Sequence, residues 1–428
     1  MAWGLLSLMT VLLLLGFPMM IPLIAAAFAG FVLLFGGLGQ METLVQQLLA
    51  GIRPASLIAV PMFILAADIM TRGQSAGRLV DLVMAFVGHV RGGLAVSTAA
   101  ACTLFGAVSG STQATVVAIG SPLRPRMLRA GYNDSFVLAL IVNASDIAFL
   151  IPPSIGMIIY GVVSGTSIAE LFIAGIGPGL LILVLFSIYG VLHATRAGVP
   201  TEPRATWAER ACALRDAVWP LGFPVIVVGG IYGGVFSPTE AAAVCVLYAL
   251  VLEGLVFRTL GLRGLVETAK STGLVTAVVF ILVAAGAAFA FVISFAQIPQ
   301  AVLGGIGIDE MGPTMVLVVI SVAFFIGCMF VDPIVVILVL VPIFAPVVQA
   351  TGLDPVHVGI IVTLQAAIGS ATPPFGCDIF TAVAVFRRPY WEVIRGTPPF
   401  IAILLGVSAL LILFPQIALF LRDLAFAG

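Results

Sequence analysis

The sequence predicts an all-α integral membrane protein made of two inverted repeats, each with a re-entrant helical hairpin and a broken helix. Three observations support this fold class. Hydrophobic residues make up 61% of the 428 residues and charged residues 9%, whereas a soluble domain carries roughly 25% charged residues. Basic residues gather in a few clusters, and prolines and glycines recur at a constant offset between the two halves of the chain.

The composition leaves no segment for a soluble domain. Several apolar segments reach the ~20 residues that a helix needs to cross a bilayer. The N-terminal segment has neither a positively charged start nor a small-residue cleavage site, so we expect a first membrane helix rather than a removable signal peptide. The 5 cysteines show no metal-binding spacing, and a net charge of -1 offers no basic patch for nucleic acid.

The positions of the basic residues predict which loops are cytoplasmic, because Lys and Arg collect on that side of a membrane. Of the 18 basic residues, all but Arg53 and Arg422 lie in five clusters. The clusters span residues 72–91, 124–129, 196–215, 258–270 and 387–395. With these segments in the cytoplasm, both termini are expected outside.

The segment 93–123 is expected to enter and leave the membrane on the cytoplasmic side. Arginines flank both of its ends, its length is large for one span and small for two, and its middle reads AVSGSTQAT. Polar, helix-weakening residues are costly against lipid. A re-entrant hairpin that turns at Ser109 to Thr112 fits all of these facts.

The segment 313–350 is the counterpart that enters from the outside. Acidic residues flank it (Asp309, Glu310 and Asp354), no basic residue lies near either end, and its middle reads FVDPIV. An aspartate and a proline at membrane depth indicate a second re-entrant hairpin. Its tip is expected at Val331 to Pro333.

The two halves match in one gapless register, with the same offset at every matched position. The shared landmarks are glycine and proline, the two residue types that set backbone geometry. The matches are Gly106 with Gly327, Pro125 with Pro346, Gly131 with Gly352, and Pro152-Pro153 with Pro373-Pro374. Each half is expected to cross the membrane an odd number of times, so the second copy is inverted.

This pattern divides the chain into a first inverted repeat (1–195), a cytoplasmic interfacial linker helix (196–216) and a second inverted repeat (217–428). In the first repeat we expect, in order, scaffold helices at 4–70, the hairpin at 93–123, a broken helix at 134–163 and a closing span at 168–195. In the second we expect scaffold helices at 217–257, an arm at 260–270, a span at 273–295, the hairpin at 313–350, a broken helix at 355–386 and a closing span at 397–421.

Inverted repeats with discontinuous helices are typical of secondary transporters, because broken helices expose carbonyl and N-H groups at the bilayer midplane. Carbonyl-rich turns suit a hard cation such as sodium, which takes oxygen ligands. Helix N-termini after the proline pairs offer positive partial charge to an anionic group of a substrate. No Lys or Arg lies in a predicted membrane core, so a carboxylate would have to be met by these N-termini and by hydroxyl groups.

Polar residues near the first hairpin tip and the first proline pair are candidate functional residues. The tip SGST, at 109–112, fits a ligand site, and the alternative is a small-residue contact between helices. Asn143, Ser145 and Asp146 precede the proline pair, and hydrogen bonding between helices is their alternative role. Both explanations stay open for these positions.

Two further carboxylates lie at membrane depth, where ionisable residues are functional by default. They are Asp332 and Asp378, although Asp332 could simply cap a half-helix. The prolines of the two pairs are expected to shape the breaks. Glu240 is expected to belong to a helix start, with Ser237 as cap and Pro238 as the first residue.

Five segments carry a resemblance to a known family. They read RLVDLVMAFVGHVRGGLA, FGAVSGSTQATVVAIGSPLRPRMLRAGY, IPPSIGMIIYGVVSGTSIAELFIAGIGPG, GGVFSPTEAAAV and DPIVVILVLVPIFAPV. In this order, and over essentially the whole chain, they resemble the large membrane (permease) subunit of tripartite ATP-independent periplasmic (TRAP) transporters, the DctM-like family.

The resemblance implies an elevator-type transporter in the bacterial inner membrane that couples uptake of a small organic acid, a carboxylate, to Na+. It implies two partners: a periplasmic solute-binding protein that delivers the substrate and a small four-helix membrane subunit that braces the scaffold. The coupling ion is the expected cofactor, with no organic cofactor and no enzymatic activity. The family also places sodium sites at the hairpin tips and at the facing broken helices.

These arguments together predict the following site residues. For sodium they are Ser109, Gly110, Ser111, Leu150, Pro152, Val331, Asp332, Gly369, Ser370 and Thr372. For the substrate they are Ser109, Ser111, Thr112, Asn143, Ser145, Asp146, Ser154, Thr372 and Asp378. Two stretches, NASDIAFLIPPS and FGCDIF, depart from the family's pattern, so Asp146, Phe149, Cys377 and Asp378 bear on substrate class and ion coupling.

Three alternative functions are considered beside this one. A self-sufficient sodium- or proton-coupled carboxylate symporter would need no binding protein, and a passive channel would need no sodium gradient. An intramembrane enzyme is disfavoured, because the sequence has no H-E-x-x-H motif and no histidine near a membrane-depth carboxylate.

Overall fold

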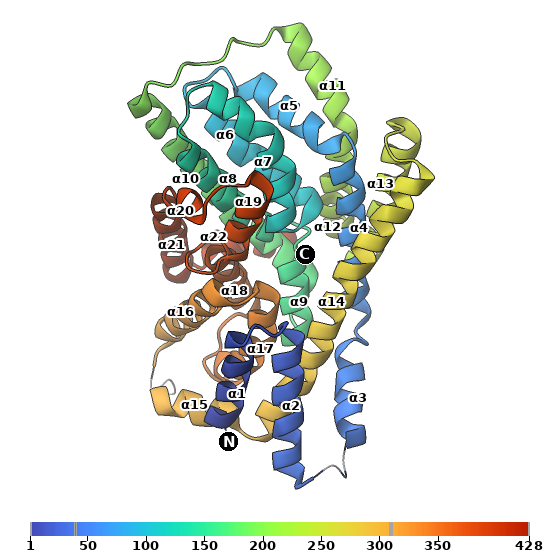
Figure 1. Ribbon diagram of the computed structural model, residues 1–428, viewed down its shortest axis with the longest axis vertical. Coiled ribbons are helices and arrows are strands. Elements are labelled where there is room, and N and C mark those ends of the chain that lie inside the picture. The colour runs from blue at the N-terminus through green and yellow to red at the C-terminus, as the bar shows by residue number, and fades with distance from the viewer. Residues whose placement is uncertain (1, 38, 40, 308–310, 427–428) are drawn as a thin grey trace.

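The computed structural model describes residues 2–37, 39, 41–307 and 311–426, and the regular structure of these residues is helical throughout (Figure 1). Seven of the described helices are long and apolar enough to cross a membrane. The predicted all-α integral membrane class is therefore confirmed. Asp309 and Glu310, which flank the second predicted hairpin, lie outside the described residues.

The first half of the chain runs from α1 to α10 and includes two 3-10 segments, η1 and η2. The bounds are α1 Ala2–Leu14, α2 Met20–Phe35, α3 Met41–Gly51, η1 Ala55–Ile58, α4 Ala59–Arg72, α5 Ser75–Val87, α6 Gly93–Ser109, α7 Thr112–Arg129, α8 Asp134–Ser145, η2 Asp146–Phe149, α9 Ile155–Ser164 and α10 Ile168–Ala197.

The second half runs from α11 to α22 and includes two π-helical segments, η3 and η4. The bounds are α11 Trp207–Pro224, η3 Val225–Gly229, α12 Gly230–Tyr232, α13 Pro238–Leu250, η4 Val251–Val256, α14 Leu262–Phe295, α15 Ile298–Ile306, α16 Pro313–Phe330, α17 Pro333–Ala350, α18 Pro355–Ser370, α19 Cys377–Phe386, α20 Tyr390–Ile394, α21 Pro398–Leu413 and α22 Gln416–Phe426.

Two helix pairs with a short break correspond to the predicted hairpins. Gly110 and Ser111 separate α6 from α7, and Val331 and Asp332 separate α16 from α17. The first and last residues of α17 are those of α7 shifted by the offset that relates the matched glycines and prolines of the two halves. In Figure 1, α6 and α7 lie in the upper half of the view, and α16 and α17 lie in the lower half. The helix boundaries thus repeat in this register, and the inversion relative to a membrane stays a prediction.

The chain leaves helical geometry at both proline pairs. The pairs Pro152-Pro153 and Pro373-Pro374 lie in the gaps before α9 and α19, and both Pro-Pro peptide bonds are cis. Proline has no N-H to donate and disfavours helical geometry in the residue before it. As a result α9 and α19 each start afresh, with their N-termini in the interior of the molecule.

The arm and the span predicted at 260–270 and 273–295 are one helix in the structure, α14, of 34 residues. In the first half, α3 is separated from α4 by a break that contains Pro54. In the second half, no proline lies within Leu262–Phe295 to interrupt the helix. The second repeat therefore lacks the break that the first repeat has.

The predicted linker helix at 196–216 also differs from the structure. Residues 199–206, which include two prolines, have no helical structure, and α11 begins after Thr206 with a capping box between Thr206 and Glu209. The helix then continues through η3 and α12 to Tyr232 as one 26-residue segment. The cap sets the start of this helix, and no residue stops it between the interfacial part and the apolar part.

The predicted closing span at 397–421 consists of two helices, α21 and α22, bent by 57°. Pro415 lies at the bend and restricts Phe414, whose backbone is not helical (φ -128°, ψ 78°). By contrast, the helix start expected at Ser237 is confirmed: Ser237 and Glu240 form a capping box, with Pro238 as the first helical residue.

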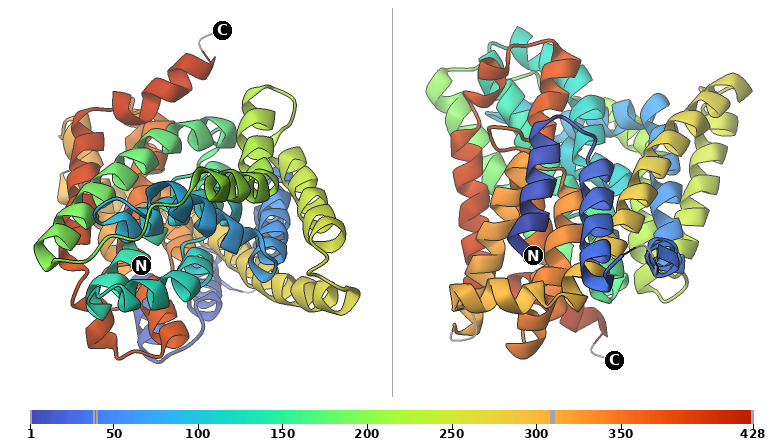
Figure 2. Two further views of the ribbon diagram at one scale, coloured as in Figure 1. Left: turned by 90° about the horizontal axis from the view of Figure 1, so that it is seen from above. Right: turned by 60° about the horizontal axis from the view of Figure 1, so that its bottom comes forward.

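The long helix α14 packs against α2, α3 and α4, and α4 packs along α13 (Figures 1 and 2). Phenylalanine rings join α2 to α14, with centroids 6.1 Å apart for Phe31 and Phe291 and 5.2 Å apart for Phe35 and Phe295. The helix pairs and the broken helices pack beside this group, with α17 against both α14 and α9.

Candidate functional site

Four helices begin at one small cavity in the interior. The first residues of α7, α9, α17 and α19 line it, together with both breaks, and its volume is about 70 Å³. The lining residues are Gly110, Ser111, Thr112, Gln113, Phe149, Ile155, Asp332, Pro333, Ile334 and Cys377. Residues of both hairpin tips and the first residues of both broken helices therefore meet at one place.

The N-terminus of a helix carries unpaired N-H groups and a positive partial charge, so four such ends suit an anionic group. Three of the ends are capped by their own side chains. Ser111 accepts from the Ala114 N-H at 3.4 Å, Ser154 from the Met157 N-H at 3.3 Å, and Asp332 from the Ile334 N-H at 2.9 Å. The cap position of α19 is Gly376, which offers no side chain.

The first hairpin tip packs directly on the start of α9. The Ile155 N-H donates to the Gly110 carbonyl oxygen at 3.3 Å. Gly110 has φ +60°, and a Cβ atom at this position would lie 2.3 Å from the Pro153 carbonyl oxygen. Below the tip, a Cβ on Gly106 would lie 2.7 Å from Ala148 Cα. Glycine at these two positions allows this close approach.

The second tip makes the equivalent contact with the break between α18 and α19. The Phe375 N-H donates to the Met329 carbonyl oxygen at 3.2 Å. A Cβ on Gly369 would lie 2.4 Å from Cys328 Cβ, and one on Gly376 would lie 2.4 Å from the Ser370 carbonyl oxygen. Gly369 thus lets the end of α18 approach α16 closely.

A hydrogen-bonded chain connects the two halves next to the cavity. The Thr112 hydroxyl donates to Asp378 Oδ1 at 2.8 Å, and the Ser370 hydroxyl lies 2.7 Å from Asp378 Oδ2. Asp378 is fully buried in the first turn of α19. Thr112 lines the cavity, so Asp378 lies directly behind its wall.

Asn143, Ser145 and Asp146 are buried beside this chain and do not line the cavity. Asn143 and Ser145 donate to carbonyl groups of their own helix, those of Ala139 and Ile141. Both carboxylate oxygens of Asp146 and the amide oxygen of Asn143 have no hydrogen-bond partner among the described residues. The polar atoms left unpaired here are therefore all acceptors.

The other predicted residues lie around the cavity in different roles. Ser109 is buried behind the first tip, with its hydroxyl 3.1 Å from that of Thr115. The Leu150 carbonyl oxygen packs against Gly175 of α10. Thr372 donates to the Ile368 carbonyl oxygen at 2.6 Å, and Val331 lines a different, apolar cavity. Pro152 is buried beside the first tip.

Six cavity-lining residues were not among the predicted ligands: Gln113, Phe149, Ile155, Pro333, Ile334 and Cys377. Phe149 and Cys377 stand out in the sequence as departures from the family's pattern. The other four lie in the first turn of a helix that starts at a tip or after a proline pair. A search of first turns at the predicted breaks would have found them.

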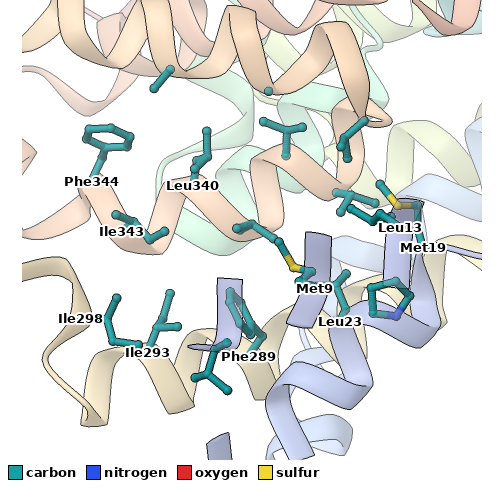
Figure 3. A pocket seen from close by; sticks show the side chains of 18 residues that line it. Met9, Leu13, Met19, Leu23, Phe289, Ile293, Ile298, Leu340, Ile343 and Phe344 are labelled. Atoms are coloured by element: carbon teal, nitrogen blue, oxygen red, sulfur yellow. The ribbon is translucent and has the colours of Figure 1, made fainter. Parts of the chain in front are cut away.

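A second cavity, of about 370 Å³, lies between the N-terminal helices and the second helix pair (Figure 3). Side chains of α1, α2, α14, α16 and α17 line it, and all of them are apolar, as Met9, Leu23, Phe289 and Phe344 illustrate in Figure 3. An ionic substrate finds no hydrogen-bond partner there. The small cavity at the four helix starts is therefore the better candidate site.

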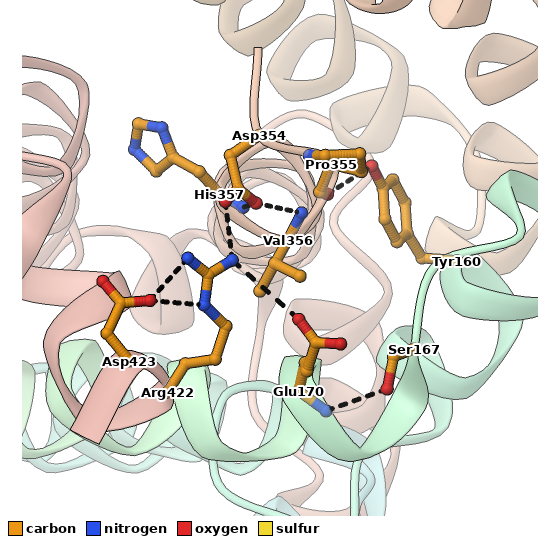
Figure 4. A network of polar contacts seen from close by, with 9 residues as sticks. All are labelled: Tyr160, Ser167, Glu170, Asp354, Pro355, Val356, His357, Arg422 and Asp423. Carbon is orange, nitrogen blue, oxygen red and sulfur yellow. Dashed lines mark hydrogen bonds and ion pairs between the residues drawn. The ribbon is translucent and has the colours of Figure 1, made fainter. Parts of the chain in front are cut away.

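Ion pairs lie at the ends of the broken helices that are far from the cavity. Arg422 contacts Asp354, the cap of α18, at 2.6 Å, and Glu170 of α10 at 3.9 Å (Figure 4). At the start of α8, Arg124 and Arg388 contact Asp134 at 2.6 Å and 2.9 Å. The hydrogen bond from Arg124 holds the pKa of the Asp134 carboxyl below its usual value.

Comparison with known proteins gives a consistent result. Residues 6–417 match the family "Tripartite ATP-independent periplasmic transporter, DctM component". The ectoine/5-hydroxyectoine TRAP transporter large permease protein UehC of Ruegeria pomeroyi is 81% identical, over 98% of each chain. The ectoine TRAP transporter large permease protein TeaC of Halomonas elongata is 76% identical, over 97% of each chain.

Among solved structures, the YdaH transporter of Alcanivorax borkumensis has a similar fold. The TM-score is 0.63 with 17% sequence identity, and the match covers 88% of each chain. At this identity the likeness concerns the fold alone, and it agrees with an all-helical membrane transporter.

Proposed function

Because the chain belongs to the DctM component family of TRAP transporters, we propose that it carries ectoine or 5-hydroxyectoine across the bacterial inner membrane, driven by sodium. The substrate is proposed from the two relatives that are 81% and 76% identical, whose names state it. Members of this family are transporter permease subunits and not enzymes, so the chain is a transport protein.

The observation that carries the proposal is the meeting of four helix N-termini at one small cavity. Ectoine is a small zwitterion with one carboxylate and one ring amidinium group. Its carboxylate can accept hydrogen bonds from the N-H groups at these helix starts, which act without any Lys or Arg. The cavity of about 70 Å³ is well below the ~300 Å³ of typical ligand pockets, so the tips must separate for the substrate to enter.

Sodium is assigned to the two hairpin tips. At the first tip, Ser109, Gly110 and Ser111 offer carbonyl and hydroxyl oxygens next to Leu150 and Pro152. The candidates at the second tip are Val331 and Asp332, together with Gly369, Ser370 and Thr372 at and after the end of α18. Gly369 approaches Cys328, which shortly precedes this tip. Asp332 caps α17 and lines the cavity, so its second oxygen can face an ion. Oxygen ligands of this kind suit a hard cation.

Movement of the site across the membrane is proposed to follow an elevator mechanism, in which α6 to α9 and α16 to α19 move against the group around α14. The periplasmic solute-binding protein and the small membrane subunit are the proposed partners, as the word tripartite indicates. The distribution of arginines supports a periplasmic location for both termini.

The test is uptake of labelled ectoine into proteoliposomes that hold the chain, the small subunit and the binding protein. Uptake is expected to require an inward sodium gradient and all three proteins. Uptake by the chain alone would favour the self-sufficient symporter, and uptake without a sodium gradient would favour a passive or proton-coupled route. No ectoine uptake by the full assembly, together with uptake of a dicarboxylate, would refute the proposed substrate.

A further inference from the structure

The interior around the cavity contains carboxyl side chains and neither Lys nor Arg. The segments 93–123, 134–164, 313–350 and 355–386 contain no Lys or Arg. They contain four aspartates, and one of these, Asp134, is paired with Arg124 and Arg388 far from the cavity. The other three are Asp146, Asp332 and Asp378. This distribution opposes the entry of a dianion and favours a ligand that brings positive charge.

The carboxyl group of Asp378 is held in a fixed orientation near the cavity. Hydroxyl groups of Thr112 and Ser370 lie within hydrogen-bond distance of its two oxygens, which fixes the orientation of the carboxylate. Thr112, which hydrogen-bonds to Asp378, and the neighbouring Cys377 both line the cavity, so Asp378 lies next to two cavity-lining residues. An ionised carboxylate can accept more hydrogen bonds than these two.

Asp146 is a buried carboxyl group without a partner of its own in the part of the chain that the structure describes. It is 1% exposed, and neither of its oxygens has a hydrogen-bond partner among the described residues. Its segment, η2, packs against α7 and α18, which carry the two hydroxyl partners of Asp378. A buried carboxylate without a partner is costly, so a cationic group near both would stabilise the pair.

We propose that Asp378, with Asp146 behind it, recognises the positively charged amidinium group of a zwitterionic substrate and so excludes dicarboxylates. This assignment rests on the proposed function and names the residues that give the site its substrate class. The substrate would lie with its carboxylate towards the helix starts, among them the α19 start, where Gly376 supplies no side-chain cap. Its amidinium would face Asp378.

An amidinium fits this position better than a transition-metal ion does. It presents two parallel N-H donors in a plane, the arrangement that pairs with both oxygens of a carboxylate. No cluster of three or more His, Cys, Asp or Glu side chains suited to a metal ion occurs in the described part of the chain. The negative charge near Asp378 can thus be balanced by the substrate itself, separately from sodium at the tips.

Cys377 offers a native reporter for the test, because it lines the cavity. Three of the other cysteines (Cys102, Cys245 and Cys328) are buried, and exposed Cys212 can be replaced by serine. In the Cys212→Ser protein, purified with its small subunit and without binding protein, the rate of N-ethylmaleimide labelling is measured in sodium. Ectoine is expected to slow the labelling. Succinate and cyclohexanecarboxylate, which lack a cation, are expected to have no effect at the same concentration.

Asp378→Asn in this background is expected to raise the half-protecting ectoine concentration about tenfold or more, because one charge partner of the substrate is lost. The matched control is Asp81→Asn, which changes an exposed aspartate that contacts only Arg126 among the described residues. The assignment would be overturned if succinate protected Cys377 as well as ectoine does, or if the half-protecting ectoine concentration were the same in Asp378→Asn as in the parent protein.

Uptake by the full assembly distinguishes a substrate-binding role of Asp378 from a sodium-binding role. Asp378→Asn is expected to raise the ectoine KM about tenfold while the sodium concentration for half-maximal uptake stays unchanged. If only the sodium dependence shifts, Asp378 is an ion ligand and the inference fails while the proposed function stands. If the wild-type assembly does not take up ectoine, the proposed function itself fails.

Discussion

Thr112 and Asp378 are 266 residues apart in the sequence, yet the Thr112 hydroxyl donates a hydrogen bond to the Asp378 carboxylate at 2.8 Å. Thr112 is the first residue of α7, and Asp378 is the second residue of α19. The first hairpin of one half thus holds the broken helix of the other half. The position of the candidate site depends on this contact between the repeats.

Removing the hydroxyl should therefore weaken both stability and transport. Thr112→Val keeps the shape of the side chain and leaves one Asp378 oxygen without its donor. We expect a loss of about 2 kcal/mol in stability, in the range for hydrogen bonds to charged groups, and a lower rate of ectoine uptake. Thr112→Ser should restore both. Thermal unfolding in detergent and proteoliposome uptake measure these effects, and wild-type behaviour of Thr112→Val would contradict the role of this bond.

Gly110 should not tolerate a side chain. Gly110→Ala combines a positive φ of +60° with a Cβ atom only 2.3 Å from the Pro153 carbonyl oxygen, so the tip would have to move away from α9. We expect loss of uptake. Gly131→Ala is the matched control, because Gly131 also has a positive φ, of +93°, but nothing lies within 4 Å of its Cβ position.

The Gly131→Ala control should lose about 1 kcal/mol of stability through backbone strain alone and should retain uptake. Both variants are compared by membrane insertion, thermal unfolding and uptake. Equal behaviour of the two variants would show that the contact with Pro153 is unimportant.

Glu253 should be a main anchor of α5. Its buried carboxylate accepts hydrogen bonds from the backbone N-H groups of Gln74 and Ser75 and from the hydroxyls of Ser75 and Thr259. Glu253→Gln replaces one acceptor oxygen by an NH2 group that faces these donors. We expect a loss of about 1 to 3 kcal/mol in thermal unfolding, whereas Glu267→Gln, at an exposed position, should have no measurable effect.

Arg422 should stabilise the junction of α10, α18 and α22. It contacts Asp354, Asp423 and, more distantly, Glu170 (Figure 4). Its side chain is only 16% exposed, so Arg422→Gln should lower stability by about 2 kcal/mol. The 95% exposed Arg263 serves as the control, and Arg263→Gln should leave the unfolding temperature unchanged. An effect of Arg422→Gln no larger than that of the control would contradict this interpretation.

The pairing of Asp134 with Arg124 predicts a dependence of stability on pH. Because the hydrogen bond from Arg124 lowers the pKa of Asp134 in the folded protein, this group stabilises the fold above the unfolded pKa of about 3.9. The contribution is lost as the pH falls through the lower folded pKa. Asp134→Asn should therefore destabilise the protein at pH 7 and progressively less below about pH 4. Thermal unfolding at several pH values checks this, and a constant difference would contradict it.

Particular residues show how far sequence reasoning reaches. The proline pairs and the SGST tip predicted breaks that the structure contains, since the effect of proline on a helix is local. The fusion of the predicted arm and span into α14, and the bend at Pro415, follow equally from where prolines are absent or present. The internal repeat does not predict these two features, because they differ between the two halves.

The sequence by itself determined that this is a helical membrane protein, where its helices break, and which family it resembles, because apolar length, proline and glycine act over a few residues. Only the tertiary structure decided that both tips and both broken helices share one cavity, and that Asp378 is held by Thr112 while Asp146 has no partner among the described residues. The physical reason is that these contacts join segments far apart in the chain, and their distances depend on how all the intervening helices pack.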